Sequence, residues 1–334
     1  MIYDSVDLFA GPGGLDMGAA EAGLRPVGIE WDSNAAATRV AAGLATVHDD
    51  VRQYVPADFP DAETLLGGPP CQTFTVAGAG AGRRALDLVV GLLHRMAARE
   101  SIAADLAGLD DVRTGLVLEP MRWALEAIDA GRPYRAIVLE QVQQVLPVWL
   151  AYAEILRAEG YSVAVGVLRS EQFGVPQTRR RAVLVARLDG VAVLPAPTHR
   201  PYRTGVLQDA GDARLLPWVS MGEALDRLGP FTVISNYGTG GDPKNRGRRT
   251  SAEPAFTVTG KISRNRIVAP SGLELPRFSH SEAGQLQGFP ADYPWSGNDI
   301  AQQVGNSVPV QLGAAIVRVA IGGTVASSVL GVAA

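Results

Sequence analysis

Residues 5–14 read Ser-Val-Asp-Leu-Phe-Ala-Gly-Pro-Gly-Gly, a short apolar run that passes into a cluster of glycines. The pattern predicts a buried strand over Ser5–Phe9, a tight turn, and a helix from about Leu15 to Ala22. Glycines between a strand and a helix let the backbone approach a ligand closely. We therefore expect a cofactor pocket at the end of this strand. Its candidate residues are Phe9, Gly11, Gly13 and Gly14.

The alternation of strands and helices continues over the first 190 residues. Further strands are expected over Pro26–Glu30, Thr64–Leu66, Arg135–Glu140 and Arg181–Ala186, and helices over Leu116–Ile128 and Val148–Glu159. Repeated strand–helix–strand units indicate an α/β fold with a doubly wound, mostly parallel sheet that is covered on both faces.

The amino-acid composition of the chain changes after Leu194. Prolines become frequent, and through about residue 275 the chain is rich in Gly, Pro, Arg and Thr, with short strand-like pieces such as Phe231–Ile234 and Ala255–Val258. Helical periodicity returns from Phe278. We therefore expect a first domain over residues 1–190, a smaller loop-rich domain over 191–275, and a segment over 276–334 that returns to complete the first domain.

Composition narrows the class of protein. The chain has 334 residues, of which 47% are hydrophobic and 19% are charged, which provides for a real core and argues against disorder. A single cysteine excludes a disulfide framework and fits a reducing cytoplasm. The N-terminus lacks the basic and apolar regions of a signal peptide. The apolar tail Val319–Ala334 is short and rich in Gly and Ser, so we expect a packed helix with a frayed end and no membrane span.

Two carboxylates, Glu30 and Asp50, stand at positions where further strands of the sheet are expected to end. Glu30 ends the second strand, where an acid commonly accepts hydrogen bonds from ribose hydroxyls, and Trp31 can stack on an adenine. Asp50 and Val51 are candidates for reading the adenine amino group. The competing hypothesis is a nicotinamide dehydrogenase. The turn lacks the third glycine of that fingerprint, and Asp16 in the first helical turn would repel a pyrophosphate, so a sulfonium cofactor without phosphates fits better.

The only cysteine, Cys71, stands in the sequence Gly-Pro-Pro-Cys-Gln of residues 68–72. A lone cysteine is most often a small buried residue. Two prolines beside glycines, however, pack poorly in a core and make a rigid turn that can present a thiol to a substrate. The turn alone leaves both interpretations open, and the further motifs along the chain, which expect a cysteine here, favour a nucleophile.

Charge is distributed unevenly although the formal net charge is only −4. From Lys244 to Arg266 there are seven basic residues and one acid, Glu253. The simple alternative is a solvated loop surface, but such asymmetry favours a polyanionic partner. The candidate contacts are Arg246, Arg248, Arg249, Lys261, Arg264 and Arg266. Four histidines, His48, His94, His199 and His280, have no ligand spacing, so no metal site is predicted.

Taken in order, these motifs resemble the C5 DNA cytosine methyltransferases, which use S-adenosylmethionine and release S-adenosyl-L-homocysteine. The similar segments span nearly the whole chain: Asp7–Gly14, Glu30-Trp31, Asp50-Val51, Pro70-Cys71-Gln72, Asp111–Leu116, Glu140-Gln141-Val142, Gln177–Arg181, Glu282–Pro290 and Gln303–Pro309. The resemblance implies a class I methyltransferase (Rossmann-like) fold with a loop-rich target-recognition domain. It adds Leu116, Asn306 and Ser307 to the cofactor-binding candidates.

The resemblance also implies catalytic and DNA-binding roles. Cys71 supplies a thiolate, Glu140 a proton for the base, and Arg181, with Arg179, holds the base oxygen and Glu140; for Arg179 a salt bridge or phosphate contact is an equal alternative. Arg180 is expected to point to the other face of its strand. A mobile loop from Gln72 to Arg84 would close over duplex DNA. Its candidate contacts are Gln72, Arg83 and Arg84.

Three departures from the family pattern stand out. Gln141 replaces the usual Asn, a helical insertion over about residues 85–109 lengthens the chain after Cys71, and Ser281 replaces a common Arg. None of these removes a reacting group.

Two alternative functions share the same fold. A transfer-RNA cytosine methyltransferase would carry a second cysteine, and a catalytically inactive DNA-binding homologue would not need an intact Cys71 and Glu140. The resemblance therefore favours a monomeric cytoplasmic modification enzyme that acts on double-stranded DNA, with a cognate restriction endonuclease as a further partner.

Overall fold

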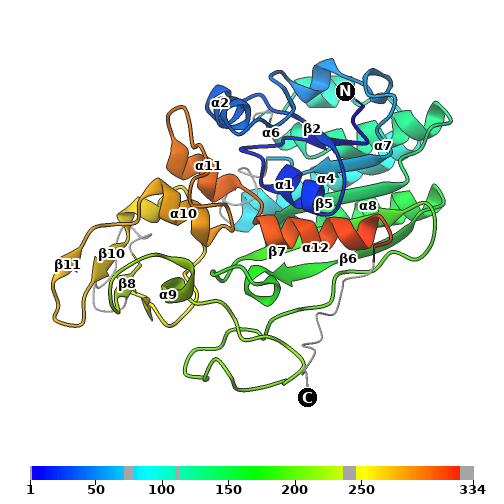
Figure 1. Ribbon diagram of the computed structural model, residues 1–334. Coiled ribbons are helices and arrows are strands. Elements are labelled where there is room, and N and C mark those ends of the chain that lie inside the picture. Colours follow the sequence, from blue (N-terminus) through cyan, green and yellow to red (C-terminus); the bar gives the residue numbers. More distant parts are fainter. Residues whose placement is uncertain (1, 71–78, 110, 112, 236–245, 324–334) are drawn as a thin grey trace.

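The protein is described by a computed structural model of residues 2–70, 79–109, 111, 113–235 and 246–323, in which residues 79–85 are described by their backbone alone. A seven-stranded sheet in the order β3-β2-β1-β4-β5-β7-β6 forms its centre (Figure 1). The strands are β1 Ser5–Leu8, β2 Pro26–Ile29, β3 Thr46–Val47, β4 Thr64–Gly67, β5 Ala136–Val142, β6 Ser162–Arg169 and β7 Arg180–Arg187. Strand β7 runs antiparallel to both of its neighbours, β5 and β6, and the remaining pairs are parallel. The predicted mostly parallel α/β fold is confirmed.

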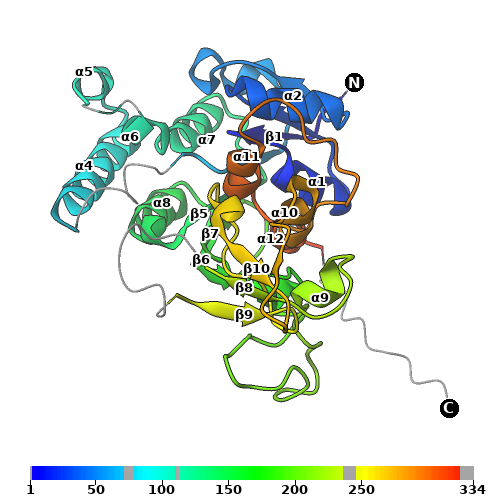
Figure 2. The same cartoon turned by 90° about the vertical axis from the view of Figure 1, so that its left-hand side faces the viewer.

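Helices cover both faces of this sheet (Figures 1 and 2). Their bounds are α1 Gly14–Glu21, α2 Ser33–Ala41, α4 Ala79–Ala97, α5 Ala103–Ala107, α6 Arg113–Leu116, α7 Glu119–Asp129, α8 Leu146–Ala158 and α12 Val310–Ala320. Successive strand residues point to opposite faces. Leu65 and Leu139 accordingly enter a core with α4, α7 and α8, whereas Leu66 and Val138 enter a second core with α1 and α12.

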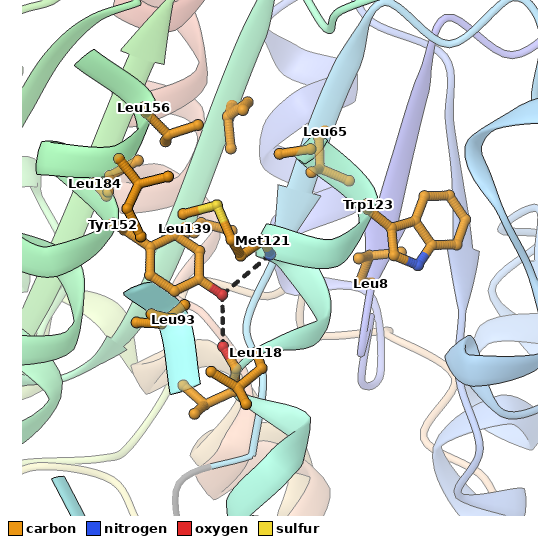
Figure 3. Close-up of a cluster of buried hydrophobic side chains, with 14 of the residues drawn as sticks. Leu8, Leu65, Leu93, Leu118, Met121, Trp123, Leu139, Tyr152, Leu156 and Leu184 are labelled. Atoms are coloured by element: carbon orange, nitrogen blue, oxygen red, sulfur yellow. Dashed lines mark hydrogen bonds between the residues drawn. The ribbon is translucent and has the colours of Figure 1, made fainter. Parts of the chain in front are cut away.

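The larger core is tied together by a buried tyrosine (Figure 3). The Tyr152 hydroxyl of α8 donates to the Val117 carbonyl at 2.6 Å and accepts from the Met121 amide at 3.1 Å. Both partners lie where α6 passes into α7. This polar link fixes the segment after Leu116, one of the cofactor-binding candidates, against the sheet's covering helices.

A smaller antiparallel sheet lies beside the carboxyl edge of the main sheet. It comprises β8 Thr232–Ile234, β9 Arg248–Thr250, β10 Arg266–Val268 and β11 Glu274–Leu275, in the order β11-β10-β8-β9, with α9 Met221–Ala224 nearby. Helices α10 His280–Leu286 and α11 Ile300–Asn306 contribute Leu286 and Val304 to the core of this sheet. After residue 275, α10 and α11 thus pack in the core of the small sheet, whereas α12 packs in a core of the main sheet.

Local expectations were wrong in three places. Residues 79–84, expected in a loop, begin helix α4, because Ala and Arg favour helix and the helix packs beside α8. Ala255–Val258 is not a strand; Ala255 makes one isolated bridge to Gln177. Strand β6 was not predicted, since it lies half-exposed at the sheet edge and contains Ala and Gly, which favour strands weakly. The helical insertion over 85–109 is confirmed by α4 and α5.

A buried ion pair supports the strand ends near the glycine-rich turn. Both carboxylate oxygens of Asp16 accept hydrogen bonds from Arg39, at 2.7 and 2.8 Å, and the two side chains are almost fully buried. The guanidinium lies so close to β2 that a side chain at Gly28 would collide with it, at 2.0 Å. Burial and the neighbouring Asp16 raise the pKa of Asp7 well above its usual value.

Replacing Arg39 with Met is expected to destabilise the protein by about 3–5 kcal/mol, because Asp16 would be left as a buried charge without a partner. Urea-induced unfolding measures this change. The exposed Arg25, paired with Asp4, provides the control, and Arg25→Met should change stability by less than about 1 kcal/mol. Equal losses in the two variants would contradict a special role for the buried pair.

Candidate active site

The glycine-rich turn after β1 has an unusual backbone. Phe9 has φ +62°, Gly11 +56° and Gly13 +104°, all in the left-handed region. A non-glycine residue rarely adopts this conformation, and such strain is typical of functional sites. Gly14 must lack a side chain, since a Cβ there would lie 2.1 Å from the Val308 carbonyl oxygen and 2.4 Å from Ser307 Oγ. The turn is thus packed directly against the segment that precedes α12.

Glu30 joins the end of β2 to this turn. Its Oε2 accepts from the Gly11 amide at 2.7 Å and its Oε1 from the Asp32 amide at 2.6 Å. Burial raises the pKa of Glu30, and these two hydrogen bonds partly oppose the shift. Trp31 is 62% exposed, with the Arg52 guanidinium 5.8 Å from its ring centroid. An indole face and a carboxylate therefore stand together beside the turn.

Asp16 does not exclude a cofactor that contains phosphates. Asp16 was expected to repel a pyrophosphate, but the structure buries it to 1% exposure and pairs it with Arg39. Its charge is neutralised within the protein and is not presented to a ligand. The missing third glycine of the nicotinamide fingerprint remains as the argument against a dehydrogenase.

The remaining cofactor candidates lie on neighbouring segments. Burial acts to raise the pKa of Asp50, but hydrogen bonds from Arg52 outweigh it and lower the pKa. The adjacent Val51 is buried, and its carbonyl accepts from Arg122 of α7 at 3.2 Å. Leu116 is half-buried at the end of α6. Ser307 is buried beside Gly14, whereas Asn306 is exposed and accepts from the Gln302 amide at 2.7 Å.

The proposed catalytic carboxyl and its arginine meet on adjacent strands. Glu140 of β5 lies opposite Val183 of β7, two residues from Arg181, so the two side chains share one face of the sheet. Glu140 Oε1 is 2.8 Å from Arg181 Nε, and Glu140 is 4% exposed. Burial raises the pKa of Glu140, with Arg181 and Arg179 opposing the shift. This carboxyl therefore retains its proton to a higher pH than an exposed glutamate does.

Arg179 donates hydrogen bonds to two backbone carbonyls, while its buried Nε has no hydrogen-bond partner among the described residues. Its two terminal nitrogens donate to the carbonyls of Val258, at 2.8 Å, and Gly305, at 2.9 Å. Burial and the charge of Arg181 lower the pKa of Arg179 well below its usual value. These contacts favour a role in holding the two sheets together near Glu140.

The turn that leads to the cysteine is anchored beside Glu140. The Gly68 amide donates to the Leu8 carbonyl at 3.2 Å, and Gln141 Nε2 donates to the Pro69 carbonyl. The longer arm of Gln141, compared with the family's Asn, thus binds the Gly-Pro-Pro segment while its Oε1 accepts from Val142. Cys71 and Gln72 lie outside the described residues, as do the side chains of Arg83 and Arg84 on α4.

Candidate DNA contacts in the basic segment fall into two groups. Arg248, Lys261 and Arg264 are exposed, and in the described parts of the chain they make no ion pair, whereas Arg246 is half-buried. Arg266 pairs with Glu274 at 3.0 Å. Arg249 is held between the rings of Tyr202 and Phe256, at 4.6 and 4.5 Å, and donates to the Pro254 and Ala255 carbonyls. We therefore regard Arg249 as a support for this domain.

Several side chains that the sequence interpretation did not single out connect the motifs. Gln177 accepts from the Val258 amide at 2.8 Å and donates to the Leu286 carbonyl at 2.8 Å and to Gln287. Tyr293 donates to the Pro12 carbonyl of the glycine-rich turn. Gln177 could have been identified from the sequence, because it is a polar residue inside a motif that resembles the family's. No sequence feature identifies Tyr293 as a connecting residue, because its partner lies far away in the chain.

The departure at Ser281 is offset by an arginine from another element. Arg227, just before the small sheet, donates to both oxygens of Glu282, the acid that follows Ser281. The Ser281 hydroxyl donates instead to the Ala291 carbonyl at 2.6 Å. A guanidinium thus still holds this acid, although it comes from a distant position.

A cavity of about 510 Å³ opens beside the Glu140–Arg181 pair. Its wall includes the end of β5, the adjoining ends of β6 and β7, and residues of the small-sheet region. The lining residues are Val142, Gln143, Gln144, Arg169, Glu171, Thr178, Arg180, Arg181, Tyr202, Thr204, Arg249 and Thr257. It therefore joins the Arg181 side of the site to the region expected to recognise DNA.

No helix within the described residues is long and apolar enough to cross a membrane. Over the same part of the chain, no group of three or more His, Cys, Asp or Glu side chains is arranged to hold a metal ion.

Solved structures of other proteins share this fold. The fold is that of a class I methyltransferase: the Schizosaccharomyces pombe Dnmt2 methyltransferase superposes with a TM-score of 0.64 at 17% identity, covering 96% of this chain and 98% of that one. The Entamoeba histolytica methyltransferase EhMeth gives 0.62 at 14% identity, covering 96% and 98% of the two chains.

Sequence comparison is more specific. The model of the C-5 cytosine-specific DNA methylases matches residues 3–91, 101–210 and 230–321, so the chain belongs to this family and is a DNA (cytosine-5-)-methyltransferase. Similar relatives include the type II methyltransferase M1.HphI of Haemophilus parahaemolyticus, 27% identical over 93% of this chain and 84% of that protein. M.NgoBI of Neisseria gonorrhoeae is also 27% identical, over 92% and 90%.

Proposed function

We propose that the enzyme methylates carbon 5 of a cytosine that is extruded from a specific duplex DNA sequence, through a transient bond between Cys71 and carbon 6. The observation that carries this proposal is the buried Glu140–Arg181 pair beside the anchored Pro69. Cys71 follows Pro69 by two residues, and consecutive Cα atoms are about 3.8 Å apart. Pro69, two residues before Cys71 in the sequence, is held by Gln141, the neighbour of the proposed proton donor Glu140.

The residues divide the chemistry as follows. Carbon 5 of cytosine is a weak nucleophile, and addition of the Cys71 thiolate to carbon 6 shifts π electron density onto carbon 5. Carbon 5 could then form a bond to the methyl group as the bond from that methyl to the sulfonium breaks and leaves a thioether. Glu140 donates its proton to N3 as the thiolate adds, and Arg181 holds Glu140 and the ring oxygen. Loss of the C5 proton to a base then restores the double bond and expels the thiolate, and N3 returns its proton to Glu140.

The glycine-rich turn fits S-adenosylmethionine. Open space surrounds the position where Gly11 would carry a Cβ, and the Glu30 carboxylate retains lone pairs for ribose hydroxyls. Trp31 offers an exposed indole face for the adenine, and Asp50 lies at the end of the next crossover. When bound, the cofactor supplies an electrophilic methyl group on a sulfonium.

Replacing Glu30 with Gln is expected to weaken S-adenosylmethionine binding about tenfold, because hydrogen bonds to a charged group contribute about 1.5–3 kcal/mol. Titration calorimetry measures the affinity. Glu21→Gln, an exposed carboxyl at the end of α1, is the matched control and should bind as the wild type does. Unchanged affinity in Glu30→Gln would remove Glu30 from the cofactor site.

Duplex DNA is the proposed macromolecular substrate. A base inside the stack hides carbon 6, so the nucleotide must swing out into the pocket beside Arg181. We assign residues 1–190 and the end of the chain to catalysis and residues 191–275 to target recognition. Arg248, Lys261 and Arg264, which are exposed, are its foremost DNA contacts, with Gln72, Arg83 and Arg84 on the catalytic side.

Transfer of a labelled methyl group tests this function. We expect incorporation into duplex DNA but not into transfer RNA, and bisulfite sequencing of DNA from expressing cells should show a single methylated sequence context. No incorporation into any DNA would contradict the proposal, and incorporation into RNA alone would favour the alternative substrate.

From its similarity to type II methyltransferases, we further propose that the protein is a monomeric cytoplasmic modification enzyme, paired with a restriction endonuclease of the same specificity.

A further inference from the structure

We infer that Arg169 and Arg180 together bind one backbone phosphate of the DNA strand that carries the target cytosine. This inference rests on the proposed function, because it needs a nucleic acid strand at the cavity beside Arg181. Neither arginine belongs to the basic segment Lys244–Arg266. They come from the end of β6 and the start of β7.

The register of the sheet places the two arginines directly opposite each other. Arg169 and Arg180 are Cα partners in the antiparallel β6–β7 pair. Side chains of such partners stand on the same face with Cβ atoms about 4.5–5.5 Å apart, and like charges in this position destabilise a sheet. An anion bound between the two guanidiniums would remove the repulsion, since arginine binds phosphate oxygens with its forked donors.

In the described residues no carboxylate lies within ion-pair distance of Arg169 or Arg180, although the Glu171 carboxyl is near enough to interact with both charges. Neither arginine forms an ion pair or a side-chain hydrogen bond there, although many other arginines do. The acid that faces them is Glu171, which is 2% exposed and whose Oε2 has no hydrogen-bond partner in the described part of the chain. One buried carboxyl therefore lies beside Arg169, Arg180 and Arg249 without satisfying any of them.

Three other donors at the cavity are already engaged. The Tyr202 hydroxyl donates to Glu253, the Thr257 hydroxyl to the Thr178 carbonyl, and Arg249 to backbone carbonyls. Arg169 and Arg180 thus offer uncommitted positive charge in a cavity that Arg181 also lines. Arg181 is the arginine assigned to the extruded base, so a phosphate close to that nucleotide fits the position.

The test uses Arg169→Gln, Arg180→Gln and the double variant. At fixed salt, the double variant should bind cognate duplex about tenfold more weakly or worse, as expected for lost charge-assisted hydrogen bonds. The slope of log K against log salt should become shallower by about 0.9, the value for one phosphate contact. Arg187→Gln, at the opposite end of β7, is the matched control and should bind DNA as the wild type does.

Affinity for S-adenosylmethionine reports folding in every variant and should not change. A second measurement replaces single phosphates of the target strand with neutral methylphosphonates. One position near the cytosine should weaken wild-type binding and have no effect on Arg180→Gln or Arg169→Gln.

A double variant that keeps the wild-type DNA affinity and salt slope would overturn the inference, as would single variants that respond to every methylphosphonate like the wild type. If the wild type itself neither binds nor methylates DNA, the proposed function fails and this inference fails with it. If the wild type methylates DNA and the variants match it, only the phosphate site is wrong.

Discussion

Cys71→Ser is expected to lower the methyl-transfer rate by more than roughly 10⁴-fold, as removal of a nucleophile does in other covalent enzymes. A serine hydroxyl stays protonated at neutral pH, whereas a thiol is already partly ionised and is intrinsically more nucleophilic. Single-turnover transfer of a labelled methyl group to cognate duplex measures the loss. Cys71→Ala should lose at least as much, since it has no nucleophile at all.

The affinity for S-adenosylmethionine shows whether a Cys71 variant loses activity because the nucleophile is missing or because the structure is disturbed. The glycine-rich turn and Glu30 lie at the ends of β1 and β2, and the Gly-Pro-Pro segment follows β4. Calorimetry should therefore give the wild-type affinity for S-adenosylmethionine in both cysteine variants. A variant that keeps measurable turnover would contradict the covalent mechanism, and one that loses cofactor affinity would contradict the separation of the two sites.

The sequence was informative where local pattern and chemistry coincide. Ser5–Leu8 is a run of buried strand residues closed by glycines, so strand, turn and helix could all be placed. Ile137–Leu139 and Ala182–Ala186 are apolar strands of the sheet centre. Glu140 and Arg181 adjoin them, and their pairing follows once β5 and β7 are neighbours.

What escaped prediction depends on contacts between distant segments. Whether Asp16 faces a ligand or Arg39 depends on how α1 and α2 pack, and periodicity within one helix does not contain that information. Arg169 and Arg180 become partners only through the register of β6, an edge strand too weakly patterned to be predicted. Sequence motifs thus pointed to the proposed reacting groups, and tertiary register showed which groups surround Glu140 and Arg181.

Glu140→Gln is expected to lower the single-turnover rate by roughly 10²–10⁴-fold, the usual contribution of a positioned proton donor. The amide nearly preserves the size of the side chain and can still lie beside Arg181, but it has no proton to transfer to N3. Binding of S-adenosylmethionine should not change, because Glu140 is absent from the glycine-rich turn.

The pH dependence identifies the role of Glu140 more directly than the rate loss. Burial raises the pKa of this carboxyl, so the protonated form that donates to N3 persists to a higher pH than the ordinary 4.5, and wild-type activity should fall as pH rises through the raised value. Ionisation of Cys71 acts in the opposite direction, since a thiol becomes reactive as pH rises. The wild-type profile should therefore be a bell, whereas Glu140→Gln should keep the rising limb and lose the falling one.

Glu119→Gln provides the matched control for this experiment. Glu119 is also a buried carboxyl paired with an arginine, and burial raises its pKa as well, but it lies at the start of α7. Replacing Glu119 with Gln should leave the bell-shaped pH dependence of the activity unchanged. A falling limb that survives in Glu140→Gln would assign the proton donor to another group, and the buried Glu140–Arg181 pair would then serve only to join β5 to β7.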